Sequence, residues 1–291
     1  MNATEIFKKV RKIEIKTRGL SNQIFSGQYH SIFKGRGMAF SEVREYQYGD
    51  DIRNIDWNVT ARFNHPYIKI FEEERELTVM LLIDVSGSNE FGTKVTLNEE
   101  MITEIAAVLA FSAIQNNDKV GVIFFSDKIE KFIPPKKGSS HILRIIRELV
   151  DFKPDNLGTS VAESLRFLTN GIKKRCTAFI LSDFMDTDFD EAMQIANNKH
   201  DVIAIRIYDP REVEIPNIGL AKFRDAETGK NVWVDTSNPK TRAIYKKWFS
   251  EKDMQLKRLF LKSGVDSARI RTDQDYVKPL INLFKRREAR L

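Results

Sequence analysis

The stretch from Leu77 to Ser88, which reads Leu-Thr-Val-Met-Leu-Leu-Ile-Asp-Val-Ser-Gly-Ser, constrains the fold of this chain more than any other. Its residues 78–83 form an unbroken, mostly apolar run, long enough for a strand and too continuous for one with a solvent-facing side. We therefore expect a buried central strand of a parallel sheet. Asp84, Ser86 and Ser88 follow at two-residue spacing. Open parallel sheets bind ligands outside the carboxyl ends of their strands, so this run predicts hard oxygen ligands for Mg²⁺ or Mn²⁺ at that edge.

Composition excludes several classes of protein. The chain has 291 residues, of which 42% are hydrophobic and 30% are charged, as in a soluble globular protein with a complete core. No apolar run approaches the roughly 20 residues that span a bilayer, and the start of the chain has no signal-peptide core. We expect a cytoplasmic protein without a transmembrane segment. The single cysteine, Cys176, excludes an internal disulfide and a cysteine metal cluster.

The basic residues are concentrated near the end of the sequence. Residues 240–291 contain fifteen Lys and Arg against six Asp and Glu. Runs such as Lys285-Arg286-Arg287 have no interleaved aromatic residues and are typical of solvated helix ends, so we expect no nucleic-acid partner.

From residue 78 onward, strand-like and helix-like segments alternate. This order predicts right-handed crossovers and an α/β fold with a doubly wound, mostly parallel sheet. Strands are expected at 78–83, 120–125, 177–181, 202–208 and 268–271, with a short edge strand at 131–133 that ends at Pro134. Helices are expected from the capping box at 96–99 through 115, and at 141–150, 160–169, 189–197, 240–262 and 276–287.

Two segments depart from this repeating pattern. A hairpin insertion at about 216–238 is expected in the C-terminal half, because strand-like residues 220–224 and 231–234 flank a Glu-Thr-Gly-Lys turn. Residues 1–77 are expected to form an appendage to the main domain, 78–291. The appendage would begin with a helix at 4–18 and continue as small strands and ordered loops, since its many aromatic side chains give it apolar mass to bury.

Two further segments place oxygen side chains at the same sheet edge as Asp84. Thr159 lies in the loop before a predicted helix, and Asp183 follows a predicted buried strand. Because the carboxyl ends of parallel strands meet at one edge, we expect these side chains to converge with Asp84.

Asp84-Val85-Ser86-Gly87-Ser88, together with Thr159 and Asp183, resembles the metal-ion-dependent adhesion site (MIDAS) of von Willebrand factor A domains. The earlier segments Gly35-Arg36-Gly37-Met38-Ala39-Phe40 and Gly49-Asp50-Asp51-Ile52-Arg53-Asn54-Ile55-Asp56-Trp57 resemble the signature of the bacterial family called domain of unknown function fifty-eight (DUF 58).

This resemblance implies a von Willebrand factor A-like, Rossmann-like domain and a set of metal ligands. Ser86, Ser88 and Thr159 would contact the ion, while Asp84 and Asp183 would hold it directly or through water. Neutral hydroxyls leave the ion under-neutralised, so an Asp or Glu of a partner protein would complete its shell. Members of this family typically occur beside MoxR-type AAA+ ATPases, so the resemblance also implies an adaptor for such an ATPase.

Two other functions are alternatives to this interaction module. A magnesium-dependent phosphatase-like hydrolase of the haloacid-dehalogenase type would need a second aspartate two residues after Asp84, where this chain has Ser86. A structural subunit with an unoccupied metal site is the other alternative. No Walker A sequence or Gly-x-Ser-x-Gly elbow is present, and we expect no enzyme activity.

Charged residues of both signs surround Trp57 in the appendage. We hypothesise that Arg44, Arg53, Asp56, Trp57 and Arg62 form a face that docks a partner. The alternative is that they make ion pairs that anchor the appendage to the main domain.

Overall fold

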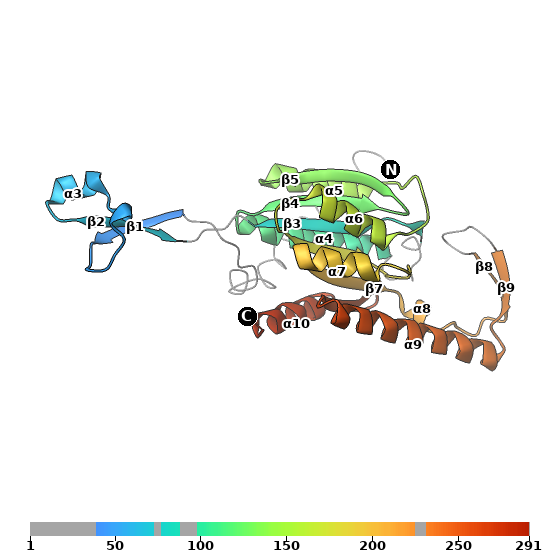
Figure 1. Ribbon diagram of the computed structural model, residues 1–291. Helices are drawn as coiled ribbons and strands as arrows, with labels where there is room; N and C mark the ends of the chain where they lie inside the picture. The colour runs from blue at the N-terminus through green and yellow to red at the C-terminus, as the bar shows by residue number, and fades with distance from the viewer. Residues whose placement is uncertain (1–38, 73–76, 88–97, 225–230, 291) are drawn as a thin grey trace. The chain divides into compact units, whose positions relative to one another are not determined.

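The structure is a computed structural model that describes residues 39–72, 77–87, 98–224 and 231–290 (Figure 1). The chain forms two compact units, Phe33–Leu77 and a larger one that contains Thr78–Leu291. The predicted helix at 4–18, the turn of the hairpin and the first residues of the capping box at 96–99 lie outside the described residues. Within the described ranges, no helix has both the length and the apolar character that a bilayer crossing requires.

The larger unit is built on a six-stranded sheet with the order β10-β7-β6-β3-β4-β5. Its strands are β3 (Thr78–Asp84), β4 (Lys119–Phe125), β5 (Ile129–Lys136), β6 (Thr177–Ser182), β7 (Asp201–Tyr208) and β10 (Asp266–Arg271). All neighbouring strands are parallel except β4 and β5, which are antiparallel. The predicted α/β fold with a mostly parallel sheet is therefore confirmed, and β3 is an inner strand, as its apolar run indicates.

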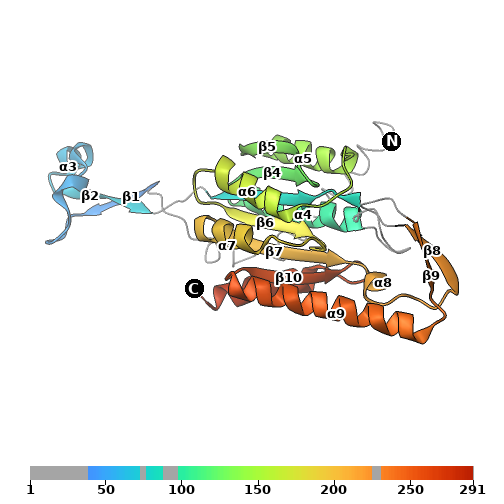
Figure 2. The same cartoon turned by 45° about the vertical axis from the view of Figure 1, so that its right-hand side comes forward.

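Helices cover both faces of this sheet (Figures 1 and 2). They are α4 (Asn98–Gln115), α5 (Ser139–Asp151), α6 (Val161–Gly171), α7 (Asp190–Lys199), α8 (Pro210–Val213), α9 (Pro239–Lys262) and α10 (Val277–Glu288). One core cluster joins Met80 and Leu82 of β3 to α6, α7 and α9. On the other face, Phe179 of β6 packs edge-on against Phe284 of α10, at 6.3 Å between ring centroids. Both faces of the inner strands are buried, which explains why these strands are continuously apolar.

Strand β5 differs from its predicted extent. The sequence predicted that this strand ends before Pro134, but β5 continues through Pro134 and Pro135 to Lys136. The pairing register with β4 shifts across these prolines, from Val122↔Ile133 to Val120↔Lys136. An edge strand tolerates proline because the missing N–H can lie on its unpaired side. The prediction of an edge position is confirmed, and the predicted end was wrong.

The predicted hairpin insertion is confirmed. β8 (Leu220–Arg224) and β9 (Asn231–Asp235) form a separate two-stranded antiparallel sheet (Figure 2). Thr236 closes its base, because the Thr236 hydroxyl donates to the Gly219 carbonyl (2.6 Å) and accepts from the Ile218 N–H (2.9 Å). Helix α8, between β7 and the hairpin, was not predicted.

The smaller unit contains β1 (Ala39–Glu45), the 3₁₀ helix η1 (Ile52–Asn54), α3 (Trp57–Phe63) and β2 (Tyr67–Glu72). β1 and β2 pair antiparallel, with a register irregularity between Phe40 and Glu42. The Thr60 hydroxyl accepts the Tyr67 N–H (3.0 Å), which ties α3 to β2. Small strands were expected here; α3 was not.

Candidate metal centre

Strand β3 places Asp84 at the carboxyl edge of the main sheet. Asp84 is the last residue of β3, and only 1% of its surface is exposed. One carboxylate oxygen accepts the Ser86 N–H (3.0 Å), and the other accepts the Ser182 hydroxyl (2.5 Å). The first bond closes a tight turn after β3, and the second ties β3 to the end of its neighbour β6.

Asp183 follows directly after β6 and is also buried, with 3% of its surface exposed. Its carboxylate accepts the Met185 N–H (3.0 Å). Burial in the first place, and then the negative charge of Asp183, raise the pKa of Asp84 to about 7. Two acidic side chains thus stand at the ends of neighbouring strands, in a buried site that disfavours a second negative charge.

The turn after Asp183 contains a strained residue. Phe184 has a left-handed backbone (φ 54°), which is uncommon for a residue with a large side chain. The Ser182 hydroxyl accepts the Phe184 N–H (3.0 Å), and the buried Phe184 ring packs edge-on against Phe260, 5.2 Å away. Packing and this hydrogen bond stabilise a backbone that costs about 1–2 kcal/mol and that turns the chain sharply after Asp183.

A third segment, residues 157–161, is hydrogen-bonded into the same edge. The Gly87 N–H donates to the Leu157 carbonyl (2.9 Å), and the Ser160 N–H donates to the Ser126 carbonyl after β4 (2.8 Å). The Val161 N–H, at the start of α6, donates to the Asp186 carboxylate (2.8 Å). Half-buried Thr159 thus lies in a loop that is bonded to the chain following β3, β4 and β6.

The structure therefore brings together the segments that carry four of the five predicted ligands: Asp84, Ser86, Thr159 and Asp183. The fifth, Ser88, lies outside the described residues. Within the described residues, no group of three or more His, Cys, Asp or Glu side chains could hold a metal ion. Two carboxylates with neighbouring hydroxyls form a different set of donors, whose hard oxygens and repelling charges suit a small divalent cation.

A cavity of about 520 Å³ adjoins the Asp84 turn. Asp84 and Ser86 line it together with Glu99 and Thr103 of α4 and Lys153 after α5. The Asp84 turn is thus reached through a cavity at the sheet edge whose lining mixes polar and apolar side chains.

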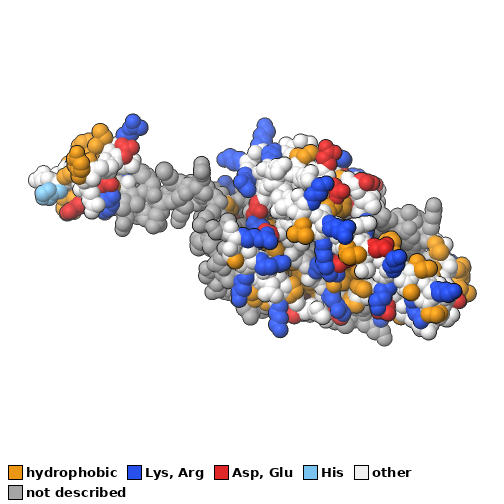
Figure 3. Space-filling view, turned by 60° about the horizontal axis from the view of Figure 1, so that its bottom comes forward, with side chains coloured by type: hydrophobic (Ala, Val, Ile, Leu, Met, Phe, Trp, Pro, Cys, Tyr) orange, Lys and Arg blue, Asp and Glu red, His pale blue; other side chains and the backbone are white. Residues whose placement is uncertain are grey.

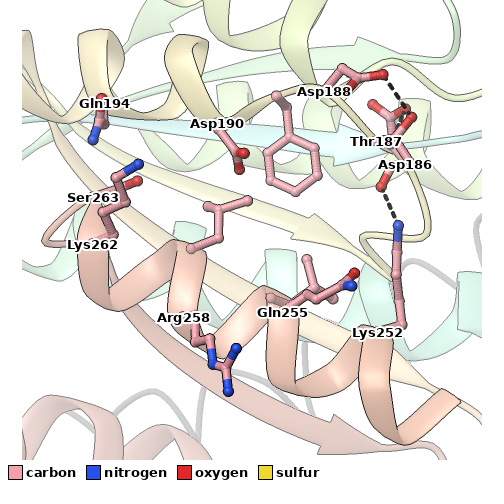
Figure 4. Close-up of a pocket in the computed structure, with 13 residues that line it drawn as sticks. Asp186, Thr187, Asp188, Asp190, Gln194, Lys252, Gln255, Arg258, Lys262 and Ser263 are labelled. Atoms are coloured by element: carbon pink, nitrogen blue, oxygen red, sulfur yellow. Dashed lines mark hydrogen bonds between the residues drawn. The ribbon is translucent and has the colours of Figure 1, made fainter. Parts of the chain in front are cut away.

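A second hollow begins three residues beyond Asp183. It is a cleft of about 370 Å³ between the loop before α7 and the C-terminal half of α9. Figure 4 shows Asp186 and Asp188 on one side and Arg258 and Lys262 on the other. At one end of the cleft, the Lys252 ammonium donates to the Asp186 carbonyl (2.9 Å). The loop that carries Asp183 therefore forms one wall of a cleft with opposite charges on its two sides.

Sequence reasoning missed a buried arginine beneath Asp183. Arg206 of β7 is 1% exposed, and its Nε donates to the Asp183 carbonyl (3.0 Å). Its Nη1 forms an ion pair with Asp253 of α9 (2.8 Å). Residues 202–208 read Val-Ile-Ala-Ile-Arg-Ile-Tyr, and this lone charge within a buried strand was the available signal, because such a charge needs a partner.

Sequence reasoning also missed Glu212 of α8. Its carboxylate accepts the Asp209 N–H (3.1 Å), which completes a capping box, and the Asn98 side-chain amide at the start of α4 (3.2 Å). Burial, followed by the negative charge of Asp183, raises the pKa of Glu212 to about 7. The signal was the Asp-Pro-Arg-Glu capping pattern directly after a buried strand.

The predicted docking residues of the smaller unit divide into two groups. Arg44 forms a two-bond ion pair with Asp50 (2.8 Å for each bond), and Asp56 caps α3 and pairs with Lys69 (3.5 Å). The other three residues, Arg53, Trp57 and Arg62, are exposed. Arg44 and Asp56 thus make ion pairs within their own unit, whereas Arg53, Trp57 and Arg62 are accessible.

Solved structures with a partly similar arrangement include the conserved hypothetical protein BatB from Bacteroides thetaiotaomicron. It is 18% identical, has a TM-score of 0.47, and aligns over 74% of this chain and all of that one. Proximal thread matrix protein 1 from the mussel byssus, described with a zinc-occupied MIDAS motif, has a TM-score of 0.37 at 18% identity and covers 45% of this chain and 38% of its own.

Among related sequences, the uncharacterized protein Rv1480 of Mycobacterium tuberculosis is 26% identical over 281 residues, which cover 96% of this chain and 88% of that one. The family model described as "Protein of unknown function DUF58" matches residues 42–255. This match spans well over half of the sequence and includes the Gly49–Trp57 segment, so the chain belongs to the DUF58 family.

Proposed function

We propose that the chain is a non-enzymatic protein-interaction module with a MIDAS-type metal centre. In this proposal Asp84, Ser86, Ser88, Thr159 and Asp183 hold Mg²⁺ or Mn²⁺ at the carboxyl edge of the main sheet. The ion then binds an acidic side chain of a partner protein at its remaining coordination position.

The observation that carries this proposal is the burial of two carboxyl groups at one edge of the sheet. Asp84 and Asp183 stand at the ends of the neighbouring strands β3 and β6, and the Ser182 hydroxyl bonds to Asp84. A cation placed between two such groups would relieve their repulsion, and hydroxyl oxygens would complete its inner shell without adding charge.

The partner follows from the charge left on the ion. Two carboxylates, one or both of them bound through water, and neutral hydroxyls leave it with affinity for a further anion, which a surface Asp or Glu supplies. A MoxR-type AAA+ ATPase in the cytoplasm is our proposed partner system, on the strength of the family resemblance alone. Catalysis of the phosphatase type is not supported, since Ser86 stands where the second aspartate of such enzymes would transfer a proton.

The first test is a Mg²⁺ or Mn²⁺ titration of the full chain followed by thermal unfolding. At one hundred times the dissociation constant, the bound ion adds about 2.7 kcal/mol to the unfolding free energy. This corresponds to a rise in Tm of roughly 5–10 °C. The substitution Asp84→Ala is expected to abolish the rise.

Asp201→Asn is the matched control, because Asp201 begins β7 at the opposite end of the same sheet and pairs with Arg287 (2.6 Å). This variant loses an ion pair but should keep the full response to the metal. Equal responses from wild type and Asp84→Ala would refute the metal centre. Turnover of a phosphate ester that requires the metal and Asp84 would favour the hydrolase instead.

A further inference from the structure

The two edges of the main sheet differ in what they offer to another strand. The β5 edge contains Pro134 and Pro135, which have no N–H to donate. The β10 edge, Asp266–Arg271, has no proline, and among the strands that the structure describes β10 pairs with β7 alone. Only one of the two edges is thus blocked by proline.

The direction of the β10 backbone groups follows from two hydrogen bonds. The Thr272 N–H donates to the Tyr208 carbonyl on the β7 side (3.2 Å), whereas the Ser267 carbonyl accepts from Arg286 of α10 (3.0 Å). Backbone groups alternate sides along a strand, so Ser267, Arg269 and Arg271 direct theirs away from β7. The Arg271 carbonyl already accepts the Gln274 N–H (3.2 Å), so the outward N–H groups along this edge and the Arg269 carbonyl are what an incoming strand would meet.

A groove of about 800 Å³ runs beside this edge, between α9 and α10. Its wall includes Leu261, which is 78% exposed, and the buried apolar residues Phe260 and Ala268. Its cationic residues are Arg206, Lys257, Arg269, Lys285, Arg286 and Arg290. Figure 3 shows this side of the molecule, where basic side chains outnumber acidic ones over the larger unit.

The two acidic residues of the groove are already paired. Asp253 contacts Arg206, Lys257 and Arg269, and Asp266 contacts Arg287 and Arg290. The Nη2 atom of Arg206, a residue that is 1% exposed and lines the groove, has no hydrogen-bond partner among the described residues. The groove therefore presents net positive charge to whatever enters it.

Charge and shape select the occupant. A second copy of this chain would bring the same cations against themselves. The N-terminal segment of the chain would also be repelled, because residues 1–32 contain six Lys and Arg against two Asp and Glu. A single-stranded nucleic acid held by base stacking would need exposed aromatic rings, but Phe260 in this groove is 4% exposed. An extended peptide with acidic side chains matches both the positive charge and the outward backbone groups.

We propose that the β10 edge and the groove between α9 and α10 bind an extended acidic segment of a partner protein as an additional strand. Arg286 now donates to the Ser267 carbonyl, so the incoming strand replaces this bond and the freed guanidinium pairs with a peptide carboxylate. This surface lies along the side of the sheet and needs no metal. The result of a binding test on this surface is therefore independent of whether the proposed metal centre exists.

The probe is a labelled peptide of roughly eight residues in which Glu alternates with Val, about the length of a strand. Binding to the full chain is followed by fluorescence anisotropy with a chelator present, so that the metal centre cannot contribute. We expect the peptide to bind, and we expect a matched peptide with Lys in place of Glu not to bind. Strong preference for a single-stranded oligothymidylate, or no binding of the Glu peptide, would overturn the proposal.

Two variants test the surface itself. Lys285→Glu reverses a charge in the groove, and Ser267→Pro removes an outward N–H without removing a bond to β7. Each is expected to weaken peptide binding by roughly tenfold. Lys278→Glu, an exposed position of α10 that is not among the groove residues, is the matched control and should bind normally. Equal binding by all three variants would refute the groove.

Hydrogen exchange keeps the test valid if Ser267→Pro does not fold. In the wild-type chain, the peptide should slow exchange of the Arg269 and Arg271 amides, which point away from β7. Peptide binding that leaves these two amides unprotected, or a dimer of the chain that protects them without peptide, would exclude the proposed strand addition.

Discussion

Arg206 shows how individual buried charges at this sheet edge are stabilised. Its guanidinium carbon lies 5.2 Å from the centre of the Phe249 ring and 5.6 Å from that of Tyr208, while Nη1 pairs with Asp253. The same side chain bonds to the Asp183 carbonyl and lines the β10 groove. Burial of an arginine is costly unless its charge is paired, and with that pairing in place we infer that Arg206 fixes the position of the Asp183 turn.

Another buried group, His200, predicts how stability depends on pH. His200 has no exposed surface, and its Nδ1 lies 3.3 Å from the sulfur of Cys176. Burial in the first place, then the charges of Lys199 and Arg175, lower its pKa to about 4. In the unfolded chain the His pKa is about 6.5. Below that value the unfolded state binds a proton that the folded state rejects, so the contribution of His200 to stability is fully present above pH 6.5 and is lost toward pH 4.

The expected loss reaches up to about 3 kcal/mol between these two pKa values. Urea unfolding at a series of pH values measures it as a difference between wild type and His200→Gln, because the raised pKa values of Asp84 and Glu212 act in the opposite direction in both proteins. His200→Gln replaces the ring with a neutral side chain, so this variant should be less stable at neutral pH but should lose less stability on acidification. If both proteins lose the same amount between pH 6.5 and 4, another group is responsible.

At the scale of elements, the end of α4 depends on one residue with a left-handed backbone. Asn117 has φ 59°, and its N–H donates to the Ile114 carbonyl (2.9 Å), while the Asp118 N–H donates to that of Ala113 (2.9 Å). This turn leads the chain from α4 into β4. Asn and Gly adopt this conformation more readily than other residues.

We therefore predict that Asn117→Ala lowers the unfolding free energy by about 1 kcal/mol, and that Asn117→Gly is close to neutral. Position 117 is exposed, so neither change should disturb packing. Chemical denaturation of the two variants measures the difference. Equal stability of the Ala and Gly variants would show that backbone strain does not govern this turn.

Most elements were predictable because each carries its own signal. Mostly apolar runs identified β3, β4, β6 and β7, and the helix predicted from residue 160 is α6, whose N-cap Ser160 accepts the Glu163 N–H (3.3 Å). Helix α8 was missed because four residues contain no hydrophobic period. The full length of β5 was missed because the irregular pairing that tolerates Pro134 and Pro135 depends on β4, not on local sequence.

At the scale of the whole molecule, the two proposed binding surfaces differed in how far sequence could predict them. The convergence of the Asp84, Thr159 and Asp183 segments follows from parallel topology, because every strand of such a sheet ends at the same edge. The β10 groove combines α9, β10 and α10, whose separation in space depends on packing. Its basic residues were visible in the sequence as a surplus after residue 240, but their common groove was not.

The proposed metal centre makes a final prediction about partner binding. A purified MoxR-type AAA+ ATPase from the same organism, presented on a biosensor surface, should bind the full chain in Mg²⁺ and release it in chelator. Thr159→Val keeps the shape of the side chain but removes the hydroxyl ligand, so it should weaken binding by roughly tenfold. Thr159→Ser restores the hydroxyl and should restore binding. Binding that survives both the chelator and Thr159→Val would show that the ATPase binds another surface. Binding lost equally in the Val and Ser variants would assign Thr159 a role in loop packing instead of metal coordination.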